Sequence, residues 1–135
     1  MREILFRGQT RRKGEKVRLD GTPVDGNWVY GGVAQFNEER AIIYQTKPEF
    51  HKFPVYADTV GQYTGLKDKN GVRVFEGDIV SVPGEDEPFI IKWEEDTAKF
   101  IIASYDIECD FDNYWGHELE IIGNIHDVGG LLKGE

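Results

Sequence analysis

The sequence has little of what secreted or membrane-spanning proteins require. It contains a single cysteine, Cys109, so no internal disulfide can form. No stretch approaches the roughly 18 consecutive apolar residues of a membrane-spanning helix. The start of the chain has an apolar run of only three residues, 4–6, whereas a signal peptide needs about seven or more. We therefore expect a soluble protein of the reducing cytoplasm that has no contact with a membrane.

Positive charge is also scarce. The 135 residues hold 16 Lys and Arg against 25 Asp and Glu, which gives a net charge of -9. A protein that binds the phosphate backbone of nucleic acids without sequence preference needs the opposite sign, so nucleic acid is not an expected partner. With 39% hydrophobic and 13% aromatic residues, the chain can bury a core without disulfides, and disorder is excluded as its main state.

The charge is divided unevenly along the chain. Residues 1–75 carry a net charge of +4 and residues 76–135 carry -13. The basic excess lies near the beginning and has three interpretations: a solvated loop or edge strand, an arm that binds phosphate, or a surface that pairs with the acidic part of another subunit. The basic residues concerned are Arg2, Arg7, Arg11, Arg12, Lys13, Lys16 and Arg18.

The apolar residues alternate with a period of two far more often than with the helical period, which predicts a mainly β protein. The Asn70-Gly71 pair predicts a hairpin closed by a type I′ turn, since both residues accept a positive φ. Helix is expected only as a turn, at residues 49–53 or in the last ten residues. The density of strands in the second half indicates a small barrel. Strands are expected at residues 27–31, 42–44, 89–93, 99–105 and 119–123, and within residues 72–82.

Residues 59–71 (TVGQYTGLKDKNG) and 75–80 (FEGDIV) resemble the signature of the YopX family of phage and prophage proteins. Residues 2–4 (REI), 28–31 (WVYG) and 121–125 (IIGNI) extend the resemblance over nearly the whole chain, which departs from the family pattern after Ile125. The resemblance implies a phage or prophage protein of the bacterial host cell with no established activity. It also implies a mainly β fold with an N-terminal β-rich segment at 1–57, an SH3-like barrel at 58–126 and a tail at 127–135.

The central motif itself is typical of a scaffold. Its glycines punctuate an extended chain at intervals that suit turns and bulges. We expect Asp78, which follows Gly77, to accept hydrogen bonds from neighbouring backbone N–H groups before a strand begins. The segment lacks the ending of a phosphate-binding P-loop and opens no helix. We therefore predict a structural role for this motif.

Residues 106–118 are the stretch most typical of a metal-binding or catalytic site, because carboxylates recur there at every second position. On an extended chain they would share one face, and in a loop they could converge on a hard cation. Measured against a calcium-binding loop, the sixth residue is Phe111 instead of Gly and the twelfth is His117 instead of Glu. We predict a solvated acidic loop, with no metal, cofactor or catalytic residue. The metal-ligand candidates, if there were a site, are Asp106, Glu108, Asp110 and Asp112.

Three functional hypotheses of different class follow. The preferred one is a non-enzymatic phage accessory protein that binds another protein or associates with itself into a homo-oligomer, with Tyr63, Tyr114 and Trp115 as exposed anchors. The second is an acidic decoy that imitates the charge of DNA and occupies a nucleic-acid-binding protein of the host. The third is a metal-dependent hydrolase that uses the acidic stretch. Trp93 is interpreted as a core or barrel-rim residue, not as a platform that stacks on bases.

Overall fold

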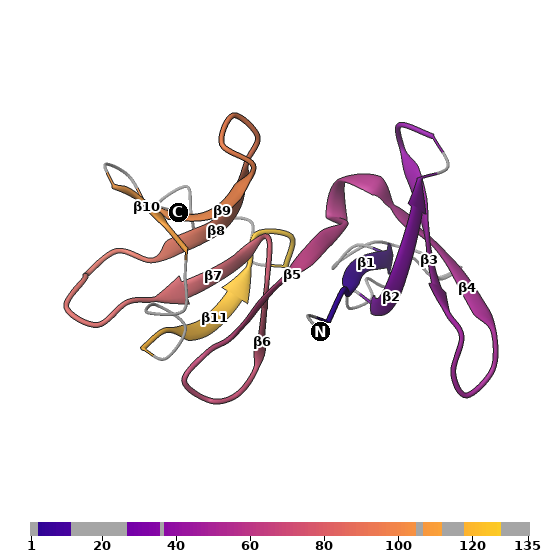
Figure 1. The fold of residues 1–135 in the computed structure, drawn as a ribbon, viewed down its shortest axis with the longest axis horizontal. Coiled ribbons are helices and arrows are strands. Elements are labelled where there is room, and N and C mark those ends of the chain that lie inside the picture. Colours follow the sequence, from indigo (N-terminus) through magenta and orange to yellow (C-terminus); the bar gives the residue numbers. More distant parts are fainter. Residues whose placement is uncertain (1–2, 12–26, 36, 105–106, 112–117, 128–135) are drawn as a thin grey trace, which may run out of the picture. The chain divides into compact units, whose positions relative to one another are not determined.

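A computed structural model describes residues 3–11, 27–35, 37–104, 107–111 and 118–127 of the chain. Within these ranges the regular structure consists of antiparallel strands and one short 3-10 helix, which confirms a mainly β protein (Figure 1). No helix in the described ranges is long and apolar enough to cross a membrane.

The chain divides into two compact units between Gln62 and Tyr63. The first unit holds β1 (Phe6–Arg11), β2 (Asn27–Gln35), β3 (Arg40–Gln45), β4 (His51–Tyr56), the 3-10 helix η1 (Ala57–Thr59) and the start of β5 (Gly61–Lys67). The second unit holds the rest of β5 together with β6 (Arg73–Phe75), β7 (Asp78–Ser81), β8 (Phe89–Glu94), β9 (Lys99–Ala103), β10 (Glu108–Asp110) and β11 (Glu120–Asn124).

In the first unit, β4, β3, β2 and β1 pair in that order and β5 joins the other side of β1. The buried core lies on one face, where Ala41, Ile43 and Val55 are packed. β1 and β4 approach each other across this core. A Cβ atom at Gly8 of β1 would lie 2.8 Å from Cγ2 of Val55, so any other residue there would force the buried Val55 side chain to shift. The sheet therefore curls around its apolar face.

Two polar side chains fix the connections of the first unit. Asn37 Oδ1 accepts hydrogen bonds from the backbone N–H groups of Glu39 and Arg40, both at 2.8 Å, and so closes the turn between β2 and β3. The Thr59 hydroxyl accepts from Gln9 N at 2.9 Å and donates to the Tyr56 carbonyl at 2.6 Å. Thr59 thereby joins η1 to β1 without a charged group.

In the second unit, β10, β9, β8, β7 and β11 form an antiparallel sheet in that order. The β-branched side chains Val80 of β7, Ile91 of β8 and Ile102 of β9 form the centre of this sheet's contribution to its core. The sheet is open in its strand pairing, with β10 and β11 at its edges, so a closed barrel stays a prediction. The core residues are Val74, Val80, Val82, Phe89, Ile91, Ile102, Phe111 and Leu119.

The hairpin between β5 and β6 is present, but its predicted turn type is wrong. Gly71 has a φ of +80°, whereas the only described non-glycine residue with a positive φ is Ala98, so Asn70 does not take the left-handed conformation of a type I′ turn. Gly71 N donates to the Asp68 carbonyl at 3.0 Å, and Asp68 N donates to the Val72 carbonyl at 2.8 Å. This arrangement is a four-residue turn ending in a left-handed glycine, which inserts one extra residue into the hairpin.

The helical turn predicted at residues 49–53 is also wrong. His51 begins β4, and Phe53 pairs with Ile43 of β3. Two residues further on, Val55 is fully buried in the first core. Pairing with β3 and burial of this side chain outweigh the poor strand propensity of a segment that contains proline.

Candidate interaction surfaces

The buried carboxylate of Asp68 binds three backbone groups of the second unit. Its Oδ1 accepts from Asn70 N and Val72 N, each at 2.9 Å, and its Oδ2 accepts from Ile121 N at 3.1 Å. The residue is only 6% exposed. A buried N–H group without an acceptor is costly, so one side chain here stabilises both the hairpin turn and its junction with β11.

Asp78 acts in the same way at the start of β7. Its Oδ2 accepts from Phe75 N at 2.7 Å, which confirms the hydrogen bonding expected from the sequence. Gly77, with a φ of +93°, makes the sharp connection between β6 and β7. Both aspartates of the central motif are thus engaged with the backbone, and the motif serves the scaffold.

Two of the four carboxylates considered as metal ligands lie in the described part of the chain. Glu108 and Asp110 alternate on β10, so they lie on the same face of the strand, and both are exposed. The Oδ1 atom of Asp110 lies 2.7 Å from Nζ of Lys99 on β9. Asp106 and Asp112 lie outside the described residues. Among the residues that are described, no three His, Cys, Asp or Glu side chains are grouped so that they could hold a metal ion.

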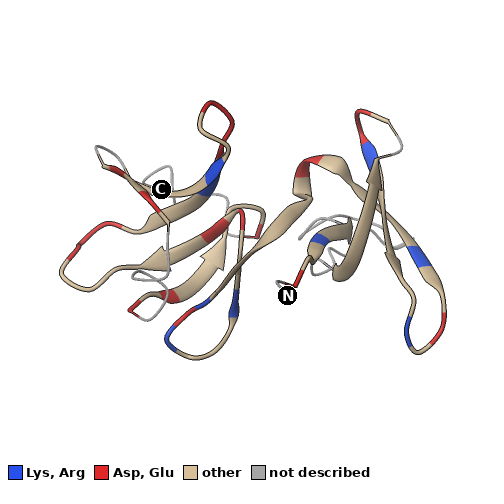
Figure 2. Ribbon diagram, viewed as in Figure 1, with Lys and Arg blue, Asp and Glu red and all other residues tan. Residues whose placement is uncertain are grey.

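An open cavity of about 310 Å³ lies beside β10 and the β8–β9 hairpin. Ile101, which is 6% exposed, gives it an apolar element, and Lys99 is its described basic residue. Figure 2 shows that acidic residues also gather at the tip of this hairpin. The cavity is lined by Glu94, Asp96, Thr97, Lys99, Ile101, Glu108, Cys109 and Asp110.

Trp93 lies at the end of the same hairpin and is 41% exposed. Its ring meets that of Phe100 on β9 edge to face, with centroids 5.0 Å apart and planes at 70°. The faces of indole rings attract cations, and the acidic loop begins directly after this strand. The pairing register puts Trp93 on the face of the sheet opposite to Glu94, Glu108 and Asp110. We call the tip of this hairpin and its cavity side the acidic hairpin surface; it comprises Glu94, Glu95, Asp96, Glu108 and Asp110.

The three aromatic anchors suggested by the sequence do not define a described surface. Tyr63 is only 6% exposed, and its ring centroid lies 5.6 Å from that of Phe75. The expectation that Tyr63 is exposed is therefore wrong, because β5 turns this side chain toward its neighbour on β6. Tyr114 and Trp115 lie outside the described residues.

Sequence reasoning missed an aromatic face on the first unit. Tyr30 on β2 and Tyr44 on β3 are 42% and 38% exposed. The Tyr44 ring lies over Gly32, where an added Cβ atom would be 2.5 Å from Cζ of the ring. The signal was present in the alternation of residues 28–34, in which Tyr30 and Gly32 have the phase opposite to that of the core residue Val33.

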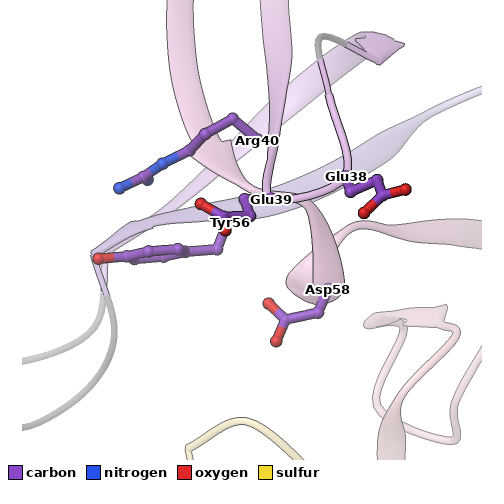
Figure 3. A pocket seen from close by; sticks show the side chains of 5 residues that line it. All are labelled: Glu38, Glu39, Arg40, Tyr56 and Asp58. Carbon is purple, nitrogen blue, oxygen red and sulfur yellow. The ribbon is translucent and has the colours of Figure 1, made fainter.

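A second cavity, of about 280 Å³, lies at the base of the β2–β3 turn (Figure 3). The Arg40 guanidinium carbon is 4.0 Å from the centre of the Tyr56 ring, which places a cation over one face of that ring. Glu38, Glu39 and Asp58 contribute carboxylates around it. The cavity therefore has mixed charge and already contains its own cation.

Comparison with known proteins identifies the family. A family model described as YopX protein matches residues 11–133, nearly the whole chain. The chain belongs to the YopX protein family. Protein EF1440 from Enterococcus faecalis has a similar crystal structure, with a TM-score of 0.51 and 20% sequence identity, over 98% of this chain and 99% of that one. At this identity the similarity concerns the fold alone, and no curated protein matches the sequence.

The central stretch that resembles the YopX signature, residues 59–80, contains two aspartates, Asp68 and Asp78, that bind the backbone. In this YopX family member the exposed features lie elsewhere, on the acidic hairpin surface and on the face of Tyr30 and Tyr44. Cys109 packs partly buried against the second core.

Proposed function

We propose that this YopX family member is a phage or prophage accessory protein that works by binding protein, without catalysis of its own. The observation that carries the proposal is the acidic hairpin surface, where the exposed carboxylates of Asp96, Glu108 and Asp110 line an open cavity. Complementary charge accelerates encounter and selects the partner. The expected partner therefore has a basic surface.

The charge of the second unit supports a basic partner. Residues 63–135 hold 17 Asp and Glu against 6 Lys and Arg. The buried carboxylates of Asp68 and Asp78 are occupied by backbone N–H groups, whereas Glu95, Asp96 and Glu108 are exposed. A field produced by such exposed charges attracts cationic proteins and weakens as salt is added.

We further propose that the second unit is an SH3-like barrel that holds this surface rigidly. Two contacts support closure between the β5–β6 hairpin and β11. Lys69 N donates to the Leu119 carbonyl at 2.9 Å, and Ile121 N donates to Asp68 at 3.1 Å. These bonds occupy backbone groups at the edge of the open sheet, where a closed barrel would place its next strand.

The proposal is tested with three variants that change the net charge equally. A hairpin variant neutralises the acidic hairpin surface, a loop control neutralises the turn between β7 and β8, and a first-unit control neutralises the other unit. Each is used to capture proteins from host lysate and then titrated with the purified captured protein at increasing salt. The substitutions are Glu95→Gln, Asp96→Asn and Glu108→Gln; Glu85→Gln, Asp86→Asn and Glu87→Gln; and Glu38→Gln, Glu39→Gln and Glu49→Gln.

The proposal expects a basic protein that binds the wild type and both controls and loses roughly tenfold or more in affinity for the hairpin variant. Binding should weaken between roughly 50 and 500 mM NaCl. Equal capture by all variants, or no specific capture, would contradict it. The acidic decoy is the second candidate, favoured by the acidic excess of the whole unit. In that case the loop control also loses affinity, and duplex DNA displaces the chain from its partner.

A further inference from the structure

The outer face of the first sheet carries tyrosines that alternate with basic residues. This face is formed by the residues of β2, β3 and β4 that have the phase opposite to Val33, Ile43 and Val55, which pack in the core. Three tyrosines lie on it, and each has a basic residue directly opposite on a neighbouring strand. The cross-strand pairs are Tyr30 with Arg7, Tyr44 with Lys52 and Tyr56 with Arg40.

Two of these tyrosines, Tyr30 and Tyr44, offer ring surface to solvent. They are 42% and 38% exposed. Gly32 lies opposite Tyr44 on β2, and the outer end of the Tyr44 ring lies over it, since an added Cβ atom would be 2.5 Å from Cζ and 2.8 Å from Cε2. The missing side chain lets the ring lie along the sheet instead of standing upright from it. One side of the ring is covered by backbone, and its exposure comes from the other side.

The strands that carry this face hold no acidic residue. β1, β2, β3 and β4 contain Arg7, Arg11, Arg40 and Lys52 and no Asp or Glu. Figure 2 shows that the described acidic residues of this unit lie before β1 or in the connections. Residues 1–62 hold 10 Lys and Arg against 8 Asp and Glu, so the net charge of -9 comes from the second unit. The charge that argued against nucleic acid is therefore absent from this face.

Exposed rings interleaved with basic side chains match single-stranded nucleic acid. Bases stack on aromatic rings, and basic side chains attract the phosphates. Rings on neighbouring strands of an exposed sheet are one arrangement by which proteins bind two or three successive bases. We propose that the outer face of the first sheet binds single-stranded nucleic acid, with bases stacked on Tyr30 and Tyr44. This inference goes beyond the proposed function, because it concerns the other unit and a different class of partner.

The order of the residues across the sheet gives the path of the bound strand. Lys52 lies on β4, Tyr44 on β3, Tyr30 on β2 and Arg7 on β1, so a basic residue flanks the two rings on each side. Tyr30 and Tyr44 are diagonal neighbours, about 7–8 Å apart. Lys52 is exposed beside Tyr44 and can meet a phosphate. Arg7 is 7% exposed, with its guanidinium carbon 4.6 Å from the centre of the Trp28 ring, and contributes its charge from beneath the surface.

The test measures the fluorescence anisotropy of labelled oligonucleotides titrated with the full chain. The probes are oligothymidylate and oligouridylate of about 15 nucleotides, with a DNA duplex of the same length for comparison. At low salt the wild type should bind a single strand roughly tenfold more tightly than the duplex, because paired bases cannot stack on the rings. The tighter of the two single strands identifies DNA or RNA as the preferred form.

Leucine variants remove the rings and keep apolar cover over the sheet. Tyr30→Leu and Tyr44→Leu should each weaken binding of the single strand roughly tenfold. Tyr30→Phe and Tyr44→Phe keep the rings and should bind like the wild type. The matched control is Phe50→Leu, which removes a 63% exposed ring of the same unit from the connection between β3 and β4 and should change nothing. Circular dichroism checks that each variant folds.

A charge variant tests the contact with phosphate. Lys52→Gln should weaken binding to every single strand and reduce the slope of log affinity against log salt by about 0.7, the value for one phosphate contact. Lys67→Gln changes the net charge equally at an exposed position of the second unit and should leave the slope unchanged. An unchanged slope in Lys52→Gln would contradict the path given for the bound strand.

Three further results would overturn the inference: no binding of either single strand at low salt, equal binding of duplex and single strand, or leucine variants that bind like the wild type. If the oligonucleotides do not bind but a captured host protein loses affinity for the leucine variants, the face is a protein contact and the inference is wrong. The hairpin variant should bind the oligonucleotides at least as tightly as the wild type. Either proposal can therefore fail while the other stands.

Discussion

The two units of the chain satisfy their buried polar groups by different means. In the first unit a neutral hydroxyl, that of Thr59, joins η1 to β1. In the second unit the carboxylates of Asp68 and Asp78 bind backbone N–H groups directly. The stretch that resembles the YopX signature, residues 59–80, lies mostly in this second unit. Aspartates in a conspicuous sequence motif can therefore stabilise the fold without forming a reactive site.

The largest expected loss of stability comes from substitutions in the two cores, which also tell the two units apart. Ile43 and Ile91 are fully buried, one in each unit, so Ile43→Ala and Ile91→Ala should each cost about 4 kcal/mol of unfolding free energy. Hydrogen exchange followed by mass spectrometry should show lost protection mainly in residues 3–62 for the first and in the described part of 63–127 for the second. The exposed residue Ile122 supplies the control, since Ile122→Ala should cost less than about 1 kcal/mol. Equal loss in both units would show that they unfold together.

The next effect concerns the carboxylate of Asp68. Asp68→Ala leaves three backbone N–H groups without their acceptor and should destabilise the second unit by about 3 kcal/mol. Asp68→Asn keeps one oxygen and should cost about half as much. Urea unfolding measures both, with Asp86→Ala in an exposed loop as the control expected to change stability by less than about 0.5 kcal/mol. A similar midpoint for Asp68→Ala and Asp86→Ala would refute the structural role.

A matched pair of glycine substitutions tests the packing between β2 and β3 in the first unit. A Cβ atom at Gly31 would overlap the carbonyl oxygen of Tyr44, which belongs to the backbone of β3, so Gly31→Ala should cost about 2–3 kcal/mol. A Cβ atom at Gly32 meets only the ring of Tyr44, which is exposed and can swing aside, so Gly32→Ala should cost about 1 kcal/mol. Thermal melting ranks the two variants. The opposite order would mean that the ring, not the backbone, limits this contact.

The smallest expected effect is a gain in unfolding free energy. Ala98 in the β8–β9 hairpin has a φ of +52°, a conformation that glycine adopts without a steric penalty. Ala98→Gly should therefore raise the unfolding free energy by about 0.5–1 kcal/mol, even though glycine adds entropy to the unfolded chain. Urea unfolding measures the gain, and Thr97→Gly is the control, expected to bring none. A loss of stability in Ala98→Gly would show that the left-handed conformation carries little strain.

The sequence predicted the second sheet better than the first. Runs of β-branched residues identified β8 and β9, and the glycine after Asn70 identified the hairpin between β5 and β6. The predicted type of the β5–β6 turn was wrong because the Asp68 carboxylate accepts hydrogen bonds that favour a different turn. One of its donors, Ile121 N, lies on a strand 53 residues away in the sequence. β4 was missed because its strand character comes from pairing with β3, which local propensity does not contain.

The candidate surfaces were harder to predict than the strands. Period-two alternation tells which residues share a face, but it does not tell which face is covered. Tyr63 was expected to be exposed because nothing in the local sequence shows that Phe75 packs against it. Trp93 was expected in the core or at its rim, and its half-exposed position follows from its place at the end of β8, where the buried face runs out.

The free margins of the sheets carry groups that discourage strand addition. β4 bears Lys52 and the ring of Pro54, β10 bears Glu108 and Asp110, and part of the outer side of β11 is bonded to the loop of Asp68. A strand of another copy that meets those margins finds charge, a missing amide hydrogen or an N–H group that is already bonded in place of a continuous ladder. Fibrous, amyloid-type growth by strand addition is thereby hindered at these margins.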